Sequence, residues 1–109
     1  MTAQPLVLTH DSPEGFKAMP VGLDGYWWET STLVCVPFVE SHDARAFLGF
    51  LNDLERKAKF VFFPTIINAR LDRLLRLRGY QDAVVPDQCK GECTCGAMGE
   101  PVFGLVKLP

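Results

Sequence analysis

The sequence lacks a long apolar run and carries almost no net charge. No segment approaches the roughly 20 continuous apolar residues that a membrane-spanning helix needs, and the net charge is −2 over 109 residues. Nucleic acids and anionic membranes attract a concentrated positive field, which this balance does not supply. The first residues also lack the basic region and apolar run of a secretion signal. We therefore expect a cytoplasmic protein without membrane contact, and nucleic acid is not an expected partner.

Cysteine is scarce, and three of the four cysteines fall within seven residues, as Cys89, Cys93 and Cys95. In a reducing compartment we interpret them as thiols or metal ligands before disulfides. Zinc is the leading metal for sulfur ligands. The C-x3-C-x-C spacing is not the usual C-x2-C pair, so a zinc site and free thiols in a Cys-rich loop over residues 86–101 both stay open. A fourth ligand would come from His10, His42, Asp87, Glu92 or a second subunit.

Apolar and aromatic residues, by contrast, are plentiful. Hydrophobic residues make up 48% of the chain, which includes eight Phe, two Trp and two Tyr, and this composition argues against disorder. A chain of this length forms one domain, here residues 1–109, and buries roughly two thirds of its unfolded surface. Residues 5–9 favour a short strand. The prolines and glycines up to residue 24 indicate turns, so we expect an irregular N-terminal region over residues 1–24.

Two segments have the apolar period of an amphipathic helix. The first is capped by Ser41 or Asp43 and runs to about Lys57. The second covers residues 66–78 and ends at Gly79, which can adopt the left-handed conformation that ends a helix. The predicted apolar faces are Ala44, Phe47, Leu48, Leu51, Leu54 and Ala58 in the first helix, and Ile67, Leu71, Leu74 and Leu75 in the second.

Five apolar runs predict strands, at residues 25–29, 32–39, 60–63, 80–85 and 102–108. Strands alternating with helices indicate an α/β layer, and the first crossover should make residues 32–39 parallel to residues 60–63. The run at 32–39 is apolar enough to be buried on both faces. Pro37 interrupts it and removes a backbone donor, so we expect a bulge there or the separation of two strands. The last two strands should pair antiparallel.

The second helix and the residues after it carry a family resemblance. Asn68 opens the helix, Leu74 and Leu75 follow, and Gly79 and Tyr80 close it. This arrangement resembles the last helix of the GNAT superfamily of N-acetyltransferases. The resemblance implies a GNAT-like mixed sheet with two main helices, in which residues 25–109 correspond to the second half of the fold. A chain with such an abbreviated N-terminal region is similar to small GNAT-like proteins of tailed bacteriophages.

The resemblance implies an acyl-CoA cofactor, with acetyl-CoA as the leading example. In the family, backbone amides of a Gly-containing loop bind the pyrophosphate at the start of a helix, which suits both the unpaired amides and the helix dipole. Alignment places His42 and Ala44 at the loop's two small positions, and only Ala44 fits. The gap between residues 34–38 and 60–63 would take the pantetheine arm. The implied cofactor contacts are Val36 and Phe38 through their backbone, His42, Ala44, Arg45 and Asn68.

For catalysis, Glu29 or Glu40 could deprotonate an amine. Glu29 is the better candidate because it follows the aromatic strand that would floor an acceptor pocket. The alternative is that both are solvent-facing turn carboxylates, as most glutamates are. Many family members protonate the departing thiolate with a Tyr, but this chain has Leu75 at that position, and Leu cannot act as an acid.

The resemblance therefore implies an acyl-CoA-dependent transfer of an acyl group to an amine, which is the function we expect. The alternative is a non-catalytic GNAT-like binding module, phage-encoded, that acts through protein–protein contacts. The missing loop glycine and Leu75 favour this alternative. A third interpretation, a metal-stabilised interaction module, depends on the cysteines. The oligomeric state stays open, a dimer included.

Overall fold

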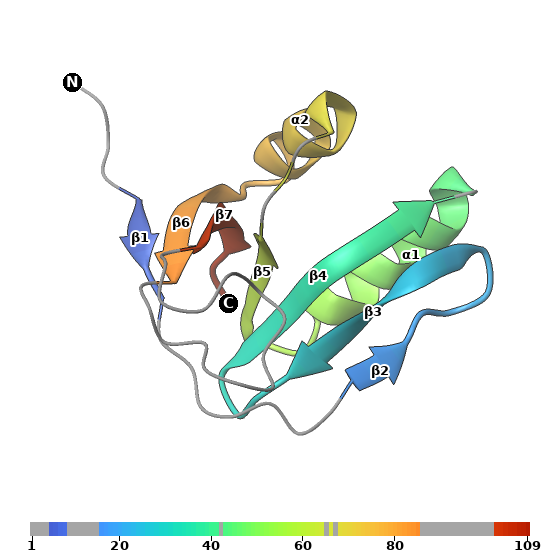
Figure 1. Ribbon diagram of the computed structural model, residues 1–109, viewed down its shortest axis with the longest axis horizontal. Coiled ribbons are helices and arrows are strands. Elements are labelled where there is room, and N and C mark those ends of the chain that lie inside the picture. The colour runs from blue at the N-terminus through green and yellow to red at the C-terminus, as the bar shows by residue number, and fades with distance from the viewer. Residues whose placement is uncertain (1–4, 9–15, 42, 65, 67, 86–101) are drawn as a thin grey trace.

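The computed structural model describes residues 5–8, 16–41, 43–64, 66, 68–85 and 102–109. These residues form one mixed sheet of seven strands and two helices, so the predicted α/β class is confirmed (Figure 1). In chain order the elements are β1 Leu6–Val7, β2 Phe16–Ala18, β3 Leu23–Glu29, β4 Leu33–Ser41, α1 Ala44–Glu55, β5 Phe60–Pro64, α2 Ala69–Leu77, β6 Gln81–Val85 and β7 Val102–Lys107.

The sheet has the strand order β1-β6-β7-β5-β4-β3-β2. Strands β4 and β5 are parallel neighbours, as predicted, and β3 pairs antiparallel with β4. The antiparallel pairing of β6 with β7 is also confirmed. Two pairings were not predicted: β1 lies parallel to β6 at one edge, and β2 lies antiparallel to β3 at the other. Strand β1 confirms the short strand predicted within residues 5–9. Strand β2 lies where turns were expected, because tertiary pairing orders a short segment that its composition marks as a turn.

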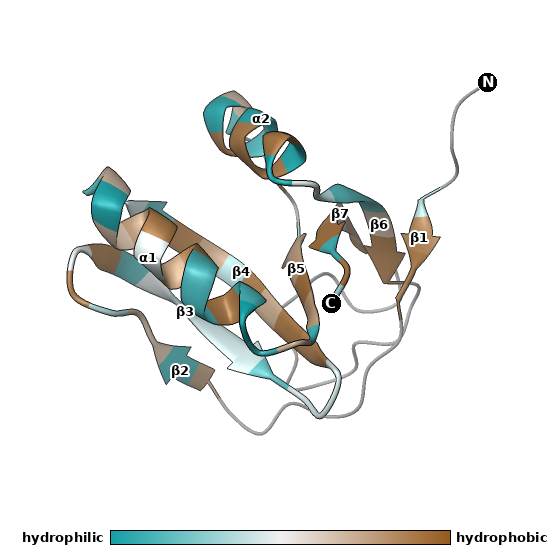
Figure 2. Ribbon diagram, turned by 180° about the vertical axis from the view of Figure 1, so that it is seen from behind, coloured by the Kyte–Doolittle hydropathy of each residue, from teal (hydrophilic) through white to brown (hydrophobic). Residues whose placement is uncertain are grey.

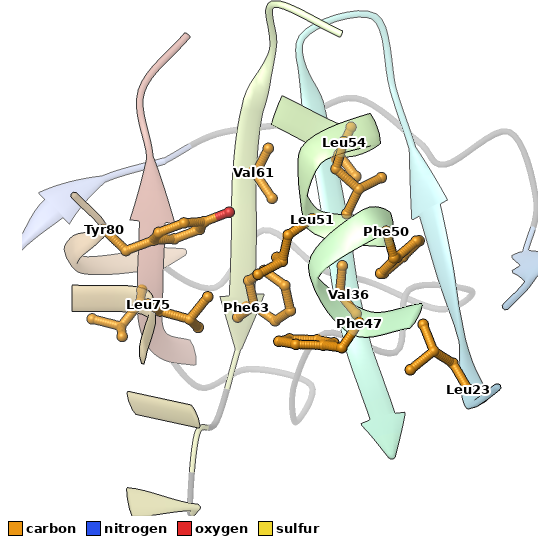
Figure 3. Packing of buried hydrophobic residues seen from close by; sticks show 12 residues of the cluster. Leu23, Val36, Phe47, Phe50, Leu51, Leu54, Val61, Phe63, Leu75 and Tyr80 are labelled. Carbon is orange, nitrogen blue, oxygen red and sulfur yellow. The ribbon is translucent and has the colours of Figure 1, made fainter. Parts of the chain in front are cut away.

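Both faces of the sheet carry apolar side chains. One face packs against the helices, with strand residues such as Val36, Val61 and Phe63 meeting side chains of α1 and α2 (Figure 3). The other face holds Trp28 and Cys35, among others. Figure 2 shows the helices from their own side of the sheet, with hydrophobic residues in β4 and β5 coloured brown. Residues 33–36 of β4 are all buried, which confirms the prediction of burial on both faces for this part of the strand. It is wrong for the part beyond Pro37, where Phe38 is 48% exposed.

Helix α1 begins where its cap predicts but buries a different face. Asp43 caps the helix and the last helical residue is Glu55, earlier than the predicted Lys57. Phe50 is 5% exposed and contacts Trp27 edge-to-face, whereas Leu48 is 37% exposed. The predicted placement of Leu48 in the core is therefore wrong. The helix is turned so that Phe50 can cover the aromatic side chain of β3.

Helix α2 stops before Gly79, as predicted, but it begins at Ala69 and not at residue 66, because Asn68 is its cap. Oδ1 of Asn68 accepts hydrogen bonds from the backbone amides of Arg70 and Leu71, at 2.9 and 3.2 Å. At the other end Gly79 has φ +97°, and the amide of Tyr80 donates back to the carbonyl of Leu75. This pattern is a Schellman motif, which satisfies the last carbonyls of a helix. Ile67, predicted to start the apolar face, lies outside the described residues.

Candidate functional site

Strands β4 and β5 separate at Pro37. Their pairing ends at Cys35 and Phe62, although β4 continues for six more residues and β5 for two. On the opposite edge of β4, the register with β3 shifts by one residue between the pairs Trp28–Cys35 and Tyr26–Phe38. The extra residue of this bulge falls in the segment that contains Pro37. Both consequences predicted for the missing proline donor, a bulge and a strand separation, are confirmed.

The separation lies next to a groove of about 740 Å³. The end of β4, the first turns of α1 and the first turns of α2 form its walls. This position, beyond the carboxyl ends of two parallel strands, is where ligands bind in open α/β sheets. The lining residues are Val39, Glu40, Ser41, Asp43, Ala44, Phe47, Leu48, Asn68, Arg70, Leu71 and Leu74.

The groove combines apolar walls with a few polar groups. Phe47 and Leu48 of α1 and Leu71 and Leu74 of α2 supply apolar surface. This mixture is typical of small-molecule sites, where a few polar groups orient a ligand that apolar groups hold. The charged lining residues are Glu40, Asp43 and Arg70.

The start of α1 is closed by the chain's own carboxylate. Oδ1 of Asp43 accepts a hydrogen bond from the backbone amide of Arg45 at 2.9 Å. The hydroxyl of Ser41 donates to the carbonyl of Asp43 at 3.0 Å. The start of α1 was predicted to bind an external anion. One of its backbone amides is instead already bound to the carboxylate of Asp43. His42, predicted to contact the cofactor here, lies outside the described residues.

Of the other predicted cofactor residues, the structure brings Ala44 and Asn68 together in the groove. Val36 is buried against the helices, and Phe38 stacks on Tyr26. The carbonyl oxygen of Phe38 lies against Gly25 of β3, so this carbonyl faces away from the gap. Successive carbonyls of a strand point to opposite edges, which directs the carbonyl of Val39 toward the gap instead.

The remaining cofactor prediction, Arg45, is exposed in the first turn of α1 and is not among the groove-lining residues. Asn68 lines the groove, but its side-chain oxygen is already used twice in capping α2. Its amide NH₂ group is thus the part left to contact a ligand.

Glu29 lies at the far end of the sheet from the groove, where β3 ends opposite Val34. Glu29 is 8% exposed, and its carboxylate contacts three ammonium groups: Lys17 at 2.7 Å, Lys59 at 3.0 Å and Lys57 at 3.8 Å. The hydrogen bond from Lys17, more than any other interaction, lowers the pKa of Glu29 to about 2. A general base needs a pKa closer to the working pH, so neither place nor charge supports the predicted catalytic role.

The alternative interpretation was that Glu29 and Glu40 are both solvent-facing turn carboxylates. It is wrong for Glu29 and correct in its exposure for Glu40. Glu29 is buried, so its description as a solvent-facing turn carboxylate is wrong. Glu40 is exposed, as that interpretation expected, and it lines the groove. The lysines around Glu29 are distant from it in sequence, and no spacing signal could have found them.

No family model, curated protein or solved structure matches this chain. Its function must therefore be inferred from the groove and the side chains around it.

Leu75, at the position where the resemblance implies a proton donor, is fully buried against the sheet. Its neighbour Arg76 bonds to Asp82 and Asp72, and these hydrogen bonds raise the pKa of Arg76 further. Neither residue can supply a proton to a leaving group.

The predicted metal ligands Cys89, Cys93 and Cys95 lie outside the described residues. Within the part of the chain that is described, no three His, Cys, Asp or Glu side chains are grouped to hold a metal ion. The fourth cysteine, Cys35, is buried in the sheet. Neither α1 nor α2 is long and apolar enough to cross a membrane.

Proposed function

We propose that the groove binds the pantetheine arm of an acyl-CoA and that the protein transfers the acyl group to an amine, as the GNAT resemblance implies. The supporting observation is the end of β4–β5 pairing at Cys35 and Phe62, which leaves the last part of β4 without a strand partner on that edge among the described residues. A cavity of about 740 Å³ lies beside this free edge, within the range of ligand sites.

A pantetheine arm suits this groove chemically. It is an extended, uncharged chain with two amide groups, so it can hydrogen-bond to a free strand edge as a peptide does. The backbone of Val39 and the amide NH₂ of Asn68 are the available partners. Leu48, Leu71 and Leu74 would cover its methylene groups.

Acyl transfer in this site would depend mainly on holding amine and thioester together, which can supply much of the rate enhancement. Glu40 replaces Glu29 as the candidate base because it lines the groove. Its carboxylate accepts a proton from the amine, directly or through water. The amine nitrogen bonds to the acyl carbon as the carbon–sulfur bond breaks, and the thiolate takes a proton from solvent.

The direct test is binding of acetyl-CoA, because a ligand of the folded state raises the melting temperature with its concentration. Leu48→Arg places a long side chain in the groove from a half-exposed helix position and should abolish the rise. Leu77→Arg, at a position of α2 that is 80% exposed and does not line the groove, is the matched control and should keep it. No rise at saturating acetyl-CoA would contradict the proposal.

A non-catalytic protein-binding module is the second candidate. It is favoured by Leu75 and by the distance of Glu29 from the groove, because a binding module needs neither an acid nor a base. An extended segment of a partner would pair with the free edge of β4, and Glu40 would favour a basic segment. This function predicts that basic peptides bind, that Leu48→Arg abolishes their binding, and that acetyl-CoA causes no thermal shift.

A further inference from the structure

We infer that the pantetheine arm, and not the nucleotide phosphates, supplies the affinity for the donor, and that Asp43 sets this preference. The inference rests on the proposed function and narrows its substrate class. The donors would be acyl-pantetheine thioesters in general, with or without a nucleotide.

The first argument is the cap of α1. A helix N-terminus attracts phosphate because its first amides lack intrahelical partners and its dipole is positive. Here Oδ1 of Asp43 accepts from the amide of Arg45 at 2.9 Å. A phosphate could reach that amide only by displacing a carboxylate that belongs to the helix itself.

The second argument is the charge of the walls. Among the described residues that line the groove, Glu40 and Asp43 carry carboxylates and only Arg70 carries a guanidinium. A phosphate at the start of α1 would lie beside the Asp43 carboxylate, and like charges repel more strongly where protein replaces water. Pantetheine carries no charge, so the same carboxylates do not oppose it.

The apolar walls supply the third argument. Phe47 and Leu48 on α1 face the groove together with Leu71 and Leu74 on α2. This surface matches the methylene groups of the arm and offers nothing to a nucleotide's phosphates. The affinity should therefore come from the part of the donor that lies between the helices.

Calorimetric titration with acetyl-pantetheine and acetyl-CoA tests the inference. We expect the wild type to bind the two thioesters within about threefold of each other. Asp43→Ser keeps a capping side chain while removing the charge, so it should tighten acetyl-CoA binding by about tenfold. Its affinity for acetyl-pantetheine should stay the same.

Two further variants make the result interpretable. Asp43→Asn caps as well as Asp and should reproduce the effect of Asp43→Ser even if the serine variant folds poorly. Asp53→Ser removes the same charge from an exposed position of α1 that does not line the groove and should change neither affinity. Acetyl-CoA binding more than about threefold tighter than acetyl-pantetheine in the wild type, or no gain in either Asp43 variant, would overturn the inference alone. Failure of both thioesters to bind the wild type would overturn the proposed function itself.

Discussion

The hydroxyl of Tyr80 donates a hydrogen bond to Oε2 of Glu55 at 2.9 Å and so joins the start of β6 to the end of α1. Arg78 binds the same carboxylate through two nitrogens, with Nη2 2.8 Å from Oε1. Burial and then the neighbouring Glu55 raise the pKa of Tyr80, so its proton stays on the oxygen. The Gly79–Tyr80 pair thus has a structural role: it ends α2 and holds that end against α1.

Tyr80→Phe should therefore lower stability without disturbing the core. The variant loses one hydrogen bond to a charged acceptor, but Glu55 keeps Arg78, so we expect a loss of about 1–2 kcal/mol in the free energy of unfolding. Urea denaturation measures it. Tyr26→Phe is the control, because its ring contacts with Phe16 and Phe38 do not need the hydroxyl. Equal losses in the two variants would show that the Glu55 contact contributes nothing.

The ion pairs of Glu29 predict a specific pH dependence. The pKa of Glu29 falls from 4.5 to about 2 on folding. A lowered pKa contributes stability above pH 4.5 that is lost as the pH falls toward 2. We expect Glu29→Gln to remove about 2 kcal/mol at pH 7, a conservative figure for this shift, and to flatten the stability profile between pH 5 and 2.

Urea titrations of both proteins across this pH range give the comparison. Glu40→Gln is the control, since Glu40 is exposed and has no ion pair among the described residues. A wild-type profile parallel to that of Glu29→Gln would mean that the lysines do not stabilise the folded state through Glu29.

Much of the fold was predictable because local chemistry and tertiary structure agree there. Asp43 and Asn68 cap their helices as their side chains dictate, and Pro37 marks the strand separation because proline cannot donate to a ladder. The predictions were wrong where contacts between residues distant in sequence determine which side chains are buried. Trp27 draws Phe50 into the core in place of Leu48.

The candidate site was predicted less well than the fold. Its location followed from the order of strands and helices, and Ala44 and Asn68 do line the groove. The interactions of the predicted site residues could not be predicted from that order. The ion pairs of Glu29 join residues 12 to 30 positions apart, and the direction of the Phe38 carbonyl depends on the bulge. Neither long-range pairing nor the position of a bulged residue leaves a periodic signal in the sequence.

Two glycines allow a test of opposite signs. Gly79 has φ +97°, where an added Cβ is strained, so Gly79→Ala should destabilise the protein by about 1 kcal/mol. Gly49 lies within α1, and a Cβ there meets no atom within 4 Å. Gly49→Ala should stabilise by about 0.5–1 kcal/mol because alanine favours the helix. Thermal unfolding of both variants measures the two changes in stability. If both substitutions stabilise or both destabilise the protein, the backbone conformation described for one of the two glycines is wrong.

Glu40 is the residue whose replacement should separate chemistry from binding. If its carboxylate accepts the amine proton, Glu40→Gln keeps the side chain's size and should reduce acyl transfer by about 100-fold. The dissociation constant for acetyl-pantetheine should stay the same, since that donor is uncharged. Thiol release from acetyl-CoA with amine acceptors measures transfer, and calorimetry measures binding.

Glu29→Gln is the matched control and should retain transfer activity, because Glu29 lies at the opposite end of β3 from the groove. Loss of activity in Glu29→Gln with full activity in Glu40→Gln would reverse the assignment of the base.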